Sequence, residues 1–157
     1  FLGTDNEIDI NSPAPFEGNV SLIDELIKPT RIYVKSALAA MKSGADIHAF
    51  SHITGGGLIE NIPRVLPKGL NVLIDPNSWS LPPLFKWIHQ YGRVDKDELY
   101  KTFNCGIGLI IIAPAKSENA LNDAFRGETI KIGEVVTSKD SNGQLCNFLG
   151  WETTWKD

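Results

Sequence analysis

The chain has 157 residues and a mass of 17.3 kDa, which is enough for one domain with a buried core. Its 42% hydrophobic and 22% charged residues are typical of a globular protein and argue against disorder. The net charge of −4 excludes a mainly electrostatic nucleic-acid binder, which would need a basic excess. The longest apolar run, over 107–114, is too short to span a bilayer, so we expect no membrane partner.

The two cysteines, Cys105 and Cys146, cannot build a disulfide framework and do not form a Cys-x-x-Cys motif. Reduced thiols in a cytoplasmic protein are therefore the expectation. His48 and His52 lie four residues apart on a predicted strand, but no third ligand accompanies them. We therefore assign no metal ligand from the sequence.

Residues 1–20 are dense in turn-forming residues without any period, which predicts an irregular lead-in to one domain over 21–157. Ser21 is placed to cap a short helix through Ile27, which Pro29 ends. The apolar spacing further on predicts helices over 33–41, 58–62, 84–92, 96–102 and 120–125, and strands over 47–53, 71–75, 107–113 and 130–132.

The strand over 107–113 is apolar without alternation, as expected of a strand that is covered on both faces. Strands interleaved with helices predict an α+β (mixed α/β) domain in which helices pack on a mixed β-sheet.

The most informative segment carries three consecutive glycines between a predicted strand and a predicted helix. Glycines permit a close backbone approach, and the N–H groups of a helix start favour an anion. We expect a phosphate here, bound by Thr54, Gly55, Gly56 and Gly57, with Arg64 as a counter-charge. The segment matches neither standard phosphate motif, and the alternative is a tight turn that binds nothing.

Three further segments contribute candidate residues. His52 precedes the glycines and could bond a phosphate or an amide oxygen, although a histidine satisfied at a strand end is the simpler interpretation. Thr30, Arg31 and Lys35 lie where a loop enters a helix, so they favour an anionic partner or belong to a solvated face.

The segment over 103–108 joins a predicted helix to the apolar strand. Asn104 could bind a ligand or cap the preceding helix. Cys105 has no neighbouring base in the sequence, and a small buried residue is its expected role.

These segments together resemble phosphoribosylformylglycinamidine cyclo-ligase, the aminoimidazole ribonucleotide synthetase family. The matching strings are PTRIYVK (29–35), HITGGGLIENIPRVLP (52–67), FNCGIG (103–108) and IGEV (132–135). They occur in the family's order, and the resemblance runs from about Leu22 to Val136.

The resemblance implies a C-terminal domain of this type, truncated at its N-terminus. All matches fall in the second of the family's two domains, and the stretch that normally opens that domain is missing. The family's N-terminal domain, which carries the metal and ATP segments and most of the dimer interface, is absent from this chain. Such a chain is expected to be inactive alone.

The resemblance also implies a reaction and its partners. The family closes formylglycinamidine ribonucleotide to aminoimidazole ribonucleotide in purine biosynthesis and releases ADP and phosphate. ATP and Mg²⁺ would be bound mainly through the missing N-terminal domain. His52 would act catalytically beside the glycine loop, and the intact protein would be a homodimer in the cytoplasm.

Two other classes of function stay open. One is a stand-alone phosphate- or nucleotide-binding module without catalysis. The other is a related enzyme with the same two-domain plan: selenophosphate synthetase, thiamine-monophosphate kinase or the glutamine-dependent amidotransferase of the preceding step. The long string over 52–67 favours the cyclo-ligase over these three.

Overall fold

The structure is a computed structural model of the chain, and it describes residues 8–139 and 145–150. In chain order the elements are β1 (Pro13–Ala14), β2 (Glu17–Ser21), α1 (Leu22–Leu26), α2 (Val34–Lys42), β3 (Ala49–His52), α3 (Gly57–Asn61), the 3₁₀ helix η1 (Pro63–Val65), β4 (Leu70–Ile74), α4 (Pro83–Gly92), α5 (Lys96–Thr102), β5 (Leu109–Ile112), the 3₁₀ helix η2 (Ala115–Ser117), α6 (Glu118–Ala124), β6 (Gly133–Thr137) and β7 (Cys146–Phe148).

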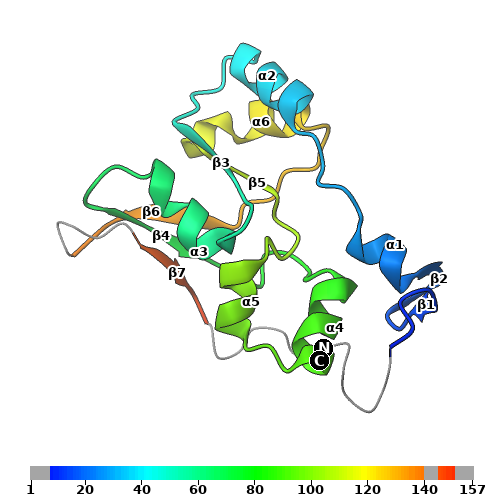
Figure 1. Cartoon of the computed structure of the whole chain (residues 1–157). Coiled ribbons are helices and arrows are strands. Elements are labelled where there is room, and N and C mark those ends of the chain that lie inside the picture. Colours follow the sequence, from blue (N-terminus) through cyan, green and yellow to red (C-terminus); the bar gives the residue numbers. More distant parts are fainter. Residues whose placement is uncertain (1–7, 140–144, 151–157) are drawn as a thin grey trace.

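The architecture is α+β, as predicted, but the strands form three small sheets (Figure 1). β3 and β5 pair antiparallel, with Ala49 opposite Ile112 and His52 opposite Leu109. In the second sheet β4 is central, antiparallel to β6 and parallel to β7, so this sheet is mixed. β1 and β2 form a separate hairpin.

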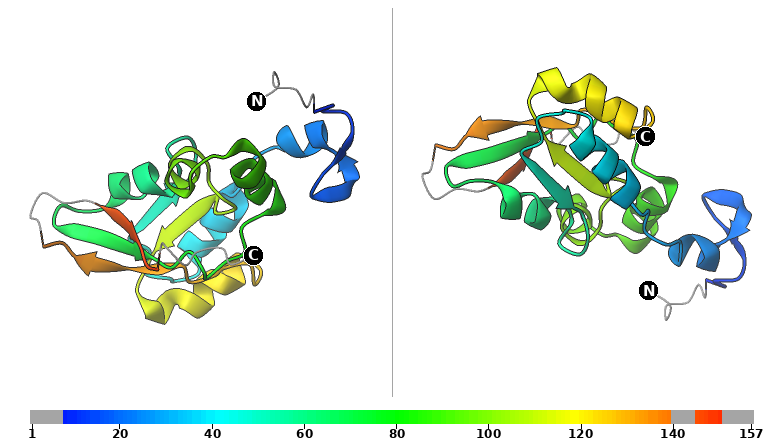
Figure 2. Two further views of the ribbon diagram at one scale, coloured as in Figure 1. Left: turned by 90° about the horizontal axis from the view of Figure 1, so that it is seen from below. Right: turned by 90° about the horizontal axis from the view of Figure 1, so that it is seen from above.

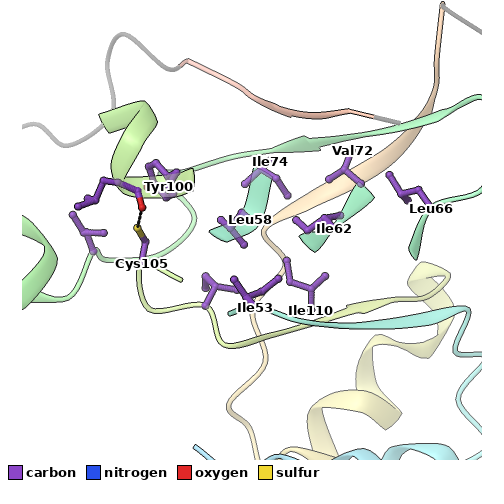
Figure 3. Close-up of a cluster of buried hydrophobic side chains, with 12 residues drawn as sticks. Ile53, Leu58, Ile62, Leu66, Val72, Ile74, Tyr100, Cys105 and Ile110 are labelled. Atoms are coloured by element: carbon purple, nitrogen blue, oxygen red, sulfur yellow. Dashed lines mark hydrogen bonds between the residues drawn. The ribbon is translucent and has the colours of Figure 1, made fainter. Parts of the chain in front are cut away.

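The main hydrophobic core lies between the two larger sheets. Figure 3 shows Leu58 of α3 and Ile62, the residue after α3, between side chains of β4 and side chains of the β3–β5 layer. α5 closes one end of this core with Leu99 and Tyr100, which are both fully buried. The core thus holds α3, and with it the glycine loop that precedes α3, against two sheets and a second helix.

A second core lies under α2 and α6, with the buried side chains of Ala40, Leu121 and Phe125 at its centre. β5 contributes to both cores, because its successive residues point to opposite sides. Leu109 and Ile111 contact the second core, whereas Ile110 belongs to the main core. The prediction that this strand is covered on both faces is confirmed.

Several helix ends follow the predicted signals. The Ser21 hydroxyl accepts a hydrogen bond from the Asp24 amide at 3.2 Å and caps α1. Gly44 and Gly127, just beyond α2 and α6, have φ values of 80° and 83°, the left-handed conformation that ends many helices. α4 differs, because it includes Gly92 and the left-handed residue is Arg93.

Other predictions are wrong in part. The lead-in expected to be irregular contains the β1–β2 hairpin, which packs with α1 and meets α4 through the Phe16 and Trp87 rings, 5.8 Å apart. Figure 2 shows this unit beside the main body. The strand predicted over 130–132 begins only at Gly133, and β7 had no prediction. Within the described residues, no helix has the length and apolar character needed to cross a membrane.

Candidate functional site

The glycine loop joins β3 to α3, as the sequence predicts, and a buried amide fixes its shape. Asn61 is buried, with 5% of the residue exposed. Its Nδ2 donates to the carbonyl oxygens of Thr54 at 3.4 Å, Gly55 at 3.2 Å and Gly57 at 2.8 Å. The loop therefore turns these carbonyls toward the protein interior.

The three glycines have different surroundings. A Cβ on Gly57, at φ 55°, would overlap the Tyr100 carbonyl oxygen, so this glycine lets α3 approach α5. A Cβ on Gly56, at φ 96°, would lie 2.7 Å from Oε2 of Glu60. A Cβ on Gly55 would meet no atom within 4 Å. The fold thus requires two of the glycines, while Gly55 borders open space.

Arg64, in η1 just after α3, contacts two residues of α3, Asn61 and Glu60. Its Nη1 donates to Oδ1 of Asn61 at 3.2 Å, and its Nη2 lies 3.6 Å from Oε2 of Glu60. The side chain remains largely exposed. The guanidinium therefore supports the Asn61 amide and still presents donors to solvent.

His52 is exposed at the end of β3 and meets Tyr33 edge to face, with ring centroids 6.2 Å apart and an interplanar angle of 69°. The Tyr33 hydroxyl lies against Gly108, where a Cβ would overlap it. The guanidinium of Arg31 stands 5.5 Å from the centroid of the Tyr33 ring. Tyr33 thus connects three segments that are distant in the sequence.

Tyr33 and Asn61 are the residues that the sequence analysis missed as parts of the site. Both lie in strings that carried the resemblance, but Tyr33 was interpreted as one apolar position of a helix face. The contact between Tyr33 and Gly108 joins residues 75 positions apart, so local sequence gives no signal of it. A buried asparagine one turn after a glycine loop is a usable signal, because buried amides need several hydrogen-bond partners.

Of the three candidate residues at the start of α2, Thr30, Arg31 and Lys35, only Arg31 contacts the site. Arg31 forms an ion pair with Glu128 and contacts Tyr33, so it stands beside the site. Thr30 and Lys35 are exposed, and neither side chain forms a hydrogen bond or ion pair with another described residue. Arg31 therefore reaches the site, and no contact in the structure brings Thr30 or Lys35 to it.

Asn104 shapes the turn before β5. Its Oδ1 accepts a hydrogen bond from the Gly106 amide at 3.0 Å, and its carbonyl accepts one from Ile107 at 2.9 Å. Cys105, between Asn104 and Gly106, has the left-handed φ of 50°. Asn104 thus stabilises the following turn, rather than capping the preceding helix.

Cys105 is fully buried, and burial raises the pKa of its thiol to about 12. Its thiol donates to the Leu99 carbonyl oxygen at 3.6 Å, and its own carbonyl accepts from Nε1 of Trp79 at 3.0 Å. A thiol with this pKa is protonated at neutral pH and is a poor nucleophile. The interpretation of Cys105 as a small buried residue is confirmed.

The described residues contain no group of three or more His, Cys, Asp or Glu side chains placed to hold a metal ion. Nε2 of His48 lies 3.5 Å from Oδ1 of Asp46, and that carboxylate also pairs with Lys116 at 3.2 Å. His48 thus belongs to a surface charge cluster, whereas His52 belongs to the site.

One comparison with known proteins bears on this arrangement. A family model described as "AIR synthase related protein, C-terminal domain" matches residues 3–146. The match includes the glycine loop, the Tyr33 segment and the turn at Asn104, which are the parts that the structure joins around α3 and β5. The chain therefore belongs to the AIR synthase related family and matches its C-terminal domain.

Proposed function

We propose that this chain is part of an ATP-dependent cyclo-ligase, which closes formylglycinamidine ribonucleotide to aminoimidazole ribonucleotide with release of ADP and phosphate. Within that enzyme the chain would supply one wall of the ligand cleft, and an N-terminal domain of the same protein would supply the other. The family membership supports an enzyme of the AIR synthase type. The strings PTRIYVK, HITGGGLIENIPRVLP and FNCGIG support the cyclo-ligase in particular.

One structural observation carries the proposal. Residues from all three strings meet at one place: Tyr33 contacts His52 and Gly108, and the glycine loop begins immediately after His52. Thr54 and Gly55 are exposed beside it, and the space above Gly55 is open. A hydroxyl, an open backbone segment, an imidazole and a nearby guanidinium suit a phosphate-bearing ligand.

The residues present fit a phosphate group better than a metal ion. Thr54 and Gly55 would hold a phosphate of the substrate or the nucleotide, with Arg31 or Arg64 as the counter-charge. Because no described cluster of ligating side chains is suited to a metal, Mg²⁺ would take its protein ligands from the N-terminal domain. When bound, ATP supplies the phosphoryl group that makes the formyl oxygen of the substrate a leaving group.

The chain's own residues would position the substrate and move protons. The Asn61 amide holds the loop in one conformation, which lowers the entropic cost of ordering it around a ligand. The His52 imidazole would hydrogen-bond the reacting amide or exchange a proton with it. The buried Cys105 thiol takes no part, and the reaction needs no covalent protein nucleophile.

The assembly and location belong to the same proposal. The intact enzyme would be a homodimer, formed mainly through the N-terminal domain, and it would act in the cytoplasm on a small-molecule substrate. The other candidate is a phosphate- or nucleotide-binding module without catalysis. It is favoured by the same loop, since an anion site at Gly55 does not by itself require a reaction.

The test compares this 157-residue chain with the full-length protein encoded by its reading frame. ATP, Mg²⁺ and formylglycinamidine ribonucleotide are added, and formation of ADP and aminoimidazole ribonucleotide is followed by mass spectrometry. We expect turnover by the full-length protein and none by the chain alone. Phosphate or nucleotide binding without turnover by the full-length protein would favour the binding module, and turnover of another substrate would favour a related enzyme.

A further inference from the structure

The Arg31 guanidinium is held by two contacts of different kinds. Its Nη2 forms an ion pair with Oε2 of Glu128, and its central carbon lies over the Tyr33 ring, 5.5 Å from the centroid. Within the part of the chain that the structure describes, no other hydrogen bond or ion pair engages this guanidinium. The group is therefore oriented, and several of its five N–H donors remain available to a ligand.

Glu128 is itself held in place by the turn that follows α6. Its amide donates to the Phe125 carbonyl oxygen at 3.2 Å, and the Gly127 amide donates to the Asn122 carbonyl oxygen at 2.8 Å. On the other side of Glu128, the Thr129 hydroxyl and amide donate to Oδ1 of Asn122 at 2.7 Å and 3.3 Å. The backbone on both sides of Glu128 is thus fixed, although its carboxylate is exposed.

Tyr33 connects this ion pair to the candidate site. The ring that Arg31 covers also meets the His52 imidazole, and the glycine loop follows directly after His52. A chain of contacts therefore leads from the turn after α6 through Glu128 and Arg31 to the site. Arg31 and Glu128 are 97 positions apart, so only the fold brings them together.

Arg64, the other candidate counter-charge, is less available. Its Nη1 donates to Oδ1 of Asn61, and its Nη2 lies 3.6 Å from Oε2 of Glu60, so both terminal nitrogens face residues of α3. The same oxygen of Glu60 lies 2.7 Å from the position of a Cβ on Gly56. An anion that approaches Arg64 from the loop would meet this carboxylate, which repels it.

We propose that Arg31 is the residue that binds the phosphate group of the ligand, and that Glu128 is a positioning residue that holds the Arg31 guanidinium on Tyr33. This inference rests on the proposed phosphate site and deepens it, because it selects Arg31 over Arg64 and adds Glu128. A guanidinium with five donors can bond a carboxylate and a phosphate at the same time. Holding the long side chain in advance lowers the entropic cost of ordering it around the ligand.

The test measures ligand binding to the full-length protein by isothermal titration calorimetry. Ribose 5-phosphate and a non-hydrolysable ATP analogue with Mg²⁺ are separate probes, because the phosphate could belong to the substrate or to the nucleotide. The variants are Arg31→Ala, Arg64→Ala, Glu128→Ala and Glu128→Gln. Glu134→Ala, at an exposed glutamate on β6 that forms no ion pair with another described residue, is the matched control.

We expect Arg31→Ala to weaken at least one probe by roughly 10- to 100-fold, and Arg64→Ala to weaken it less. Glu128→Ala should weaken the same probe by roughly 3- to 10-fold, whereas Glu128→Gln, whose amide oxygen still accepts from Nη2, should restore most of the affinity. Added to Arg31→Ala, Glu128→Ala should have no further effect. The probe that loses affinity identifies the phosphate as that of the substrate or that of the nucleotide.

Thermal unfolding separates positioning from stability. The Arg31 and Glu128 side chains are 50% and 53% exposed, and an ion pair with this exposure contributes little to stability. The melting temperatures of the Arg31 and Glu128 variants should therefore stay close to that of the wild type. A loss of affinity at an unchanged melting temperature is the result that a merely structural ion pair would not give.

Three results would overturn the inference: wild-type affinity of Arg31→Ala for both probes, a larger loss in Arg64→Ala, or an effect of Glu128→Ala that persists in the Arg31→Ala background. Gly55→Val distinguishes this failure from failure of the proposed site. If Gly55→Val loses binding and Arg31→Ala does not, the phosphate site stands and only the role of Arg31 is wrong. Absence of binding of both probes to the wild type would overturn the site and the inference together.

Discussion

Gly55, Gly56 and Gly57 show how neighbouring identical residues can serve different purposes. Gly57 permits contact with the backbone of α5, Gly56 takes a left-handed conformation, and Gly55 borders open space. Gly56→Val, the obvious variant for blocking a phosphate, would strain the backbone as well and would therefore mix stability with binding. At Gly55 the backbone is not left-handed and the space is open, so a substitution there tests phosphate binding without a large change in stability.

We predict that Gly55→Val leaves the free energy of unfolding nearly unchanged, because a Cβ at this position meets no atom within 4 Å and the backbone is not in the left-handed region. In the proposed cyclo-ligase it should lower kcat/KM by roughly 30- to 150-fold, the loss of about 2–3 kcal/mol of the proposed phosphate contacts. Gly57→Ala should instead destabilise the fold by about 3 kcal/mol or more, since its Cβ overlaps a backbone carbonyl at positive φ. Melting temperatures and kcat/KM measured on the same preparations check both variants.

The proposed site at the loop is contradicted if Gly55→Val folds normally and keeps full kcat/KM. The loop would then be a turn that connects β3 to α3 and nothing more.

Asn61 permits a second residue-scale prediction. Asn61→Asp keeps the shape of the side chain but replaces the Nδ2 donor by a carboxylate oxygen that faces three carbonyl oxygens. We expect the free energy of unfolding at pH 7 to fall by roughly 2–3 kcal/mol, because the three carbonyls lose their donor and face a buried carboxylate oxygen, a cost that the retained contact of Oδ1 with Arg64 offsets only in part. Urea denaturation measures the change.

Two controls make the Asn61 test specific. Asn61→Asp should recover part of its stability at low pH, where a protonated carboxyl can donate to one carbonyl. Asn104→Asp retains the Oδ1 acceptor of the Gly106 amide and should cost less. Equal costs for the two variants at pH 7 would show that the Asn61 amide does not fix the loop.

At the scale of elements, the start of α2 meets the start of β5 through Tyr33 and Gly108. A Cβ on Gly108 would overlap the Tyr33 hydroxyl but would lie 3.0 Å from Cζ and 3.2 Å from Cε2 of the same ring. We therefore predict that Gly108→Ala destabilises the chain and that Tyr33→Phe, by removing the hydroxyl, restores part of the loss.

A double-mutant cycle of thermal unfolding tests this contact. The coupling energy should be favourable and about 1 kcal/mol, within the range of residues in direct contact. Tyr91→Phe removes a hydroxyl from an exposed tyrosine on α4 and serves as the control partner. Additive effects for Gly108→Ala and Tyr33→Phe would contradict the packing of these two elements.

The same elements show what sequence could predict. α5 occupies the predicted range 96–102, and α1 begins after its predicted Ser21 cap, because caps and proline act through neighbouring residues. β7 has three residues and is held by parallel pairing with β4 some 74 positions away, which no local pattern encodes.

The remaining strand errors have equally specific causes. Ile130 and Ile132, alternating with Lys131, predict a half-exposed strand with both isoleucines on its covered face, but Ile130 is exposed and only Ile132 packs against the main core. Regular pairing starts at Gly133, where β6 comes close enough to β4 that a Cβ would overlap the Leu73 carbonyl oxygen. The alternation therefore failed at Ile130, and the close approach of the two backbones at Gly133 sets the boundary of the strand.

The site could likewise be predicted only in part. The glycine loop, His52 and Arg64 were recognisable from residue type and order. The structure added Asn61, which holds the loop, and Tyr33, which joins His52 to Gly108. Both additions depend on packing around α3 and β5, so they require the whole molecule.

Across the whole molecule, the two thiols report on different parts of the structure. Burial raises the pKa of Cys105 and the pKa of Cys146 to about 12 each. Cys105 is fully buried in the main core, whereas Cys146 is only partly buried on β7, a three-residue strand at the edge of its sheet. We therefore expect a maleimide at pH 8 to modify Cys146 first, by local opening of β7, and Cys105 only with global unfolding.

Urea dependence distinguishes the two openings. The labelling rate of Cys105, measured in Cys146→Ser, should rise steeply with urea, whereas the rate of Cys146 at low urea should hardly change. Equal rates and equal urea slopes for both thiols would show that β7 does not open separately from the core.

The raised thiol pKa also predicts how stability depends on pH. An acid whose pKa is higher in the folded state stays protonated there, while the unfolded chain loses the proton above its ordinary pKa of 9.0. The stability contributed by this thiol is therefore complete below pH 9 and is lost as the pH rises from 9 toward 12.

Urea denaturation of the wild type and of Cys146→Ala between pH 8 and pH 10.5 tests this dependence. The difference in stability between the two proteins cancels the lysine and tyrosine titrations that are common to both. The wild type should lose stability relative to the variant by up to about 1.4 kcal/mol per pH unit above pH 9. A difference that stays constant over this range would mean that the Cys146 thiol titrates normally in the folded protein and that β7 does not shield it.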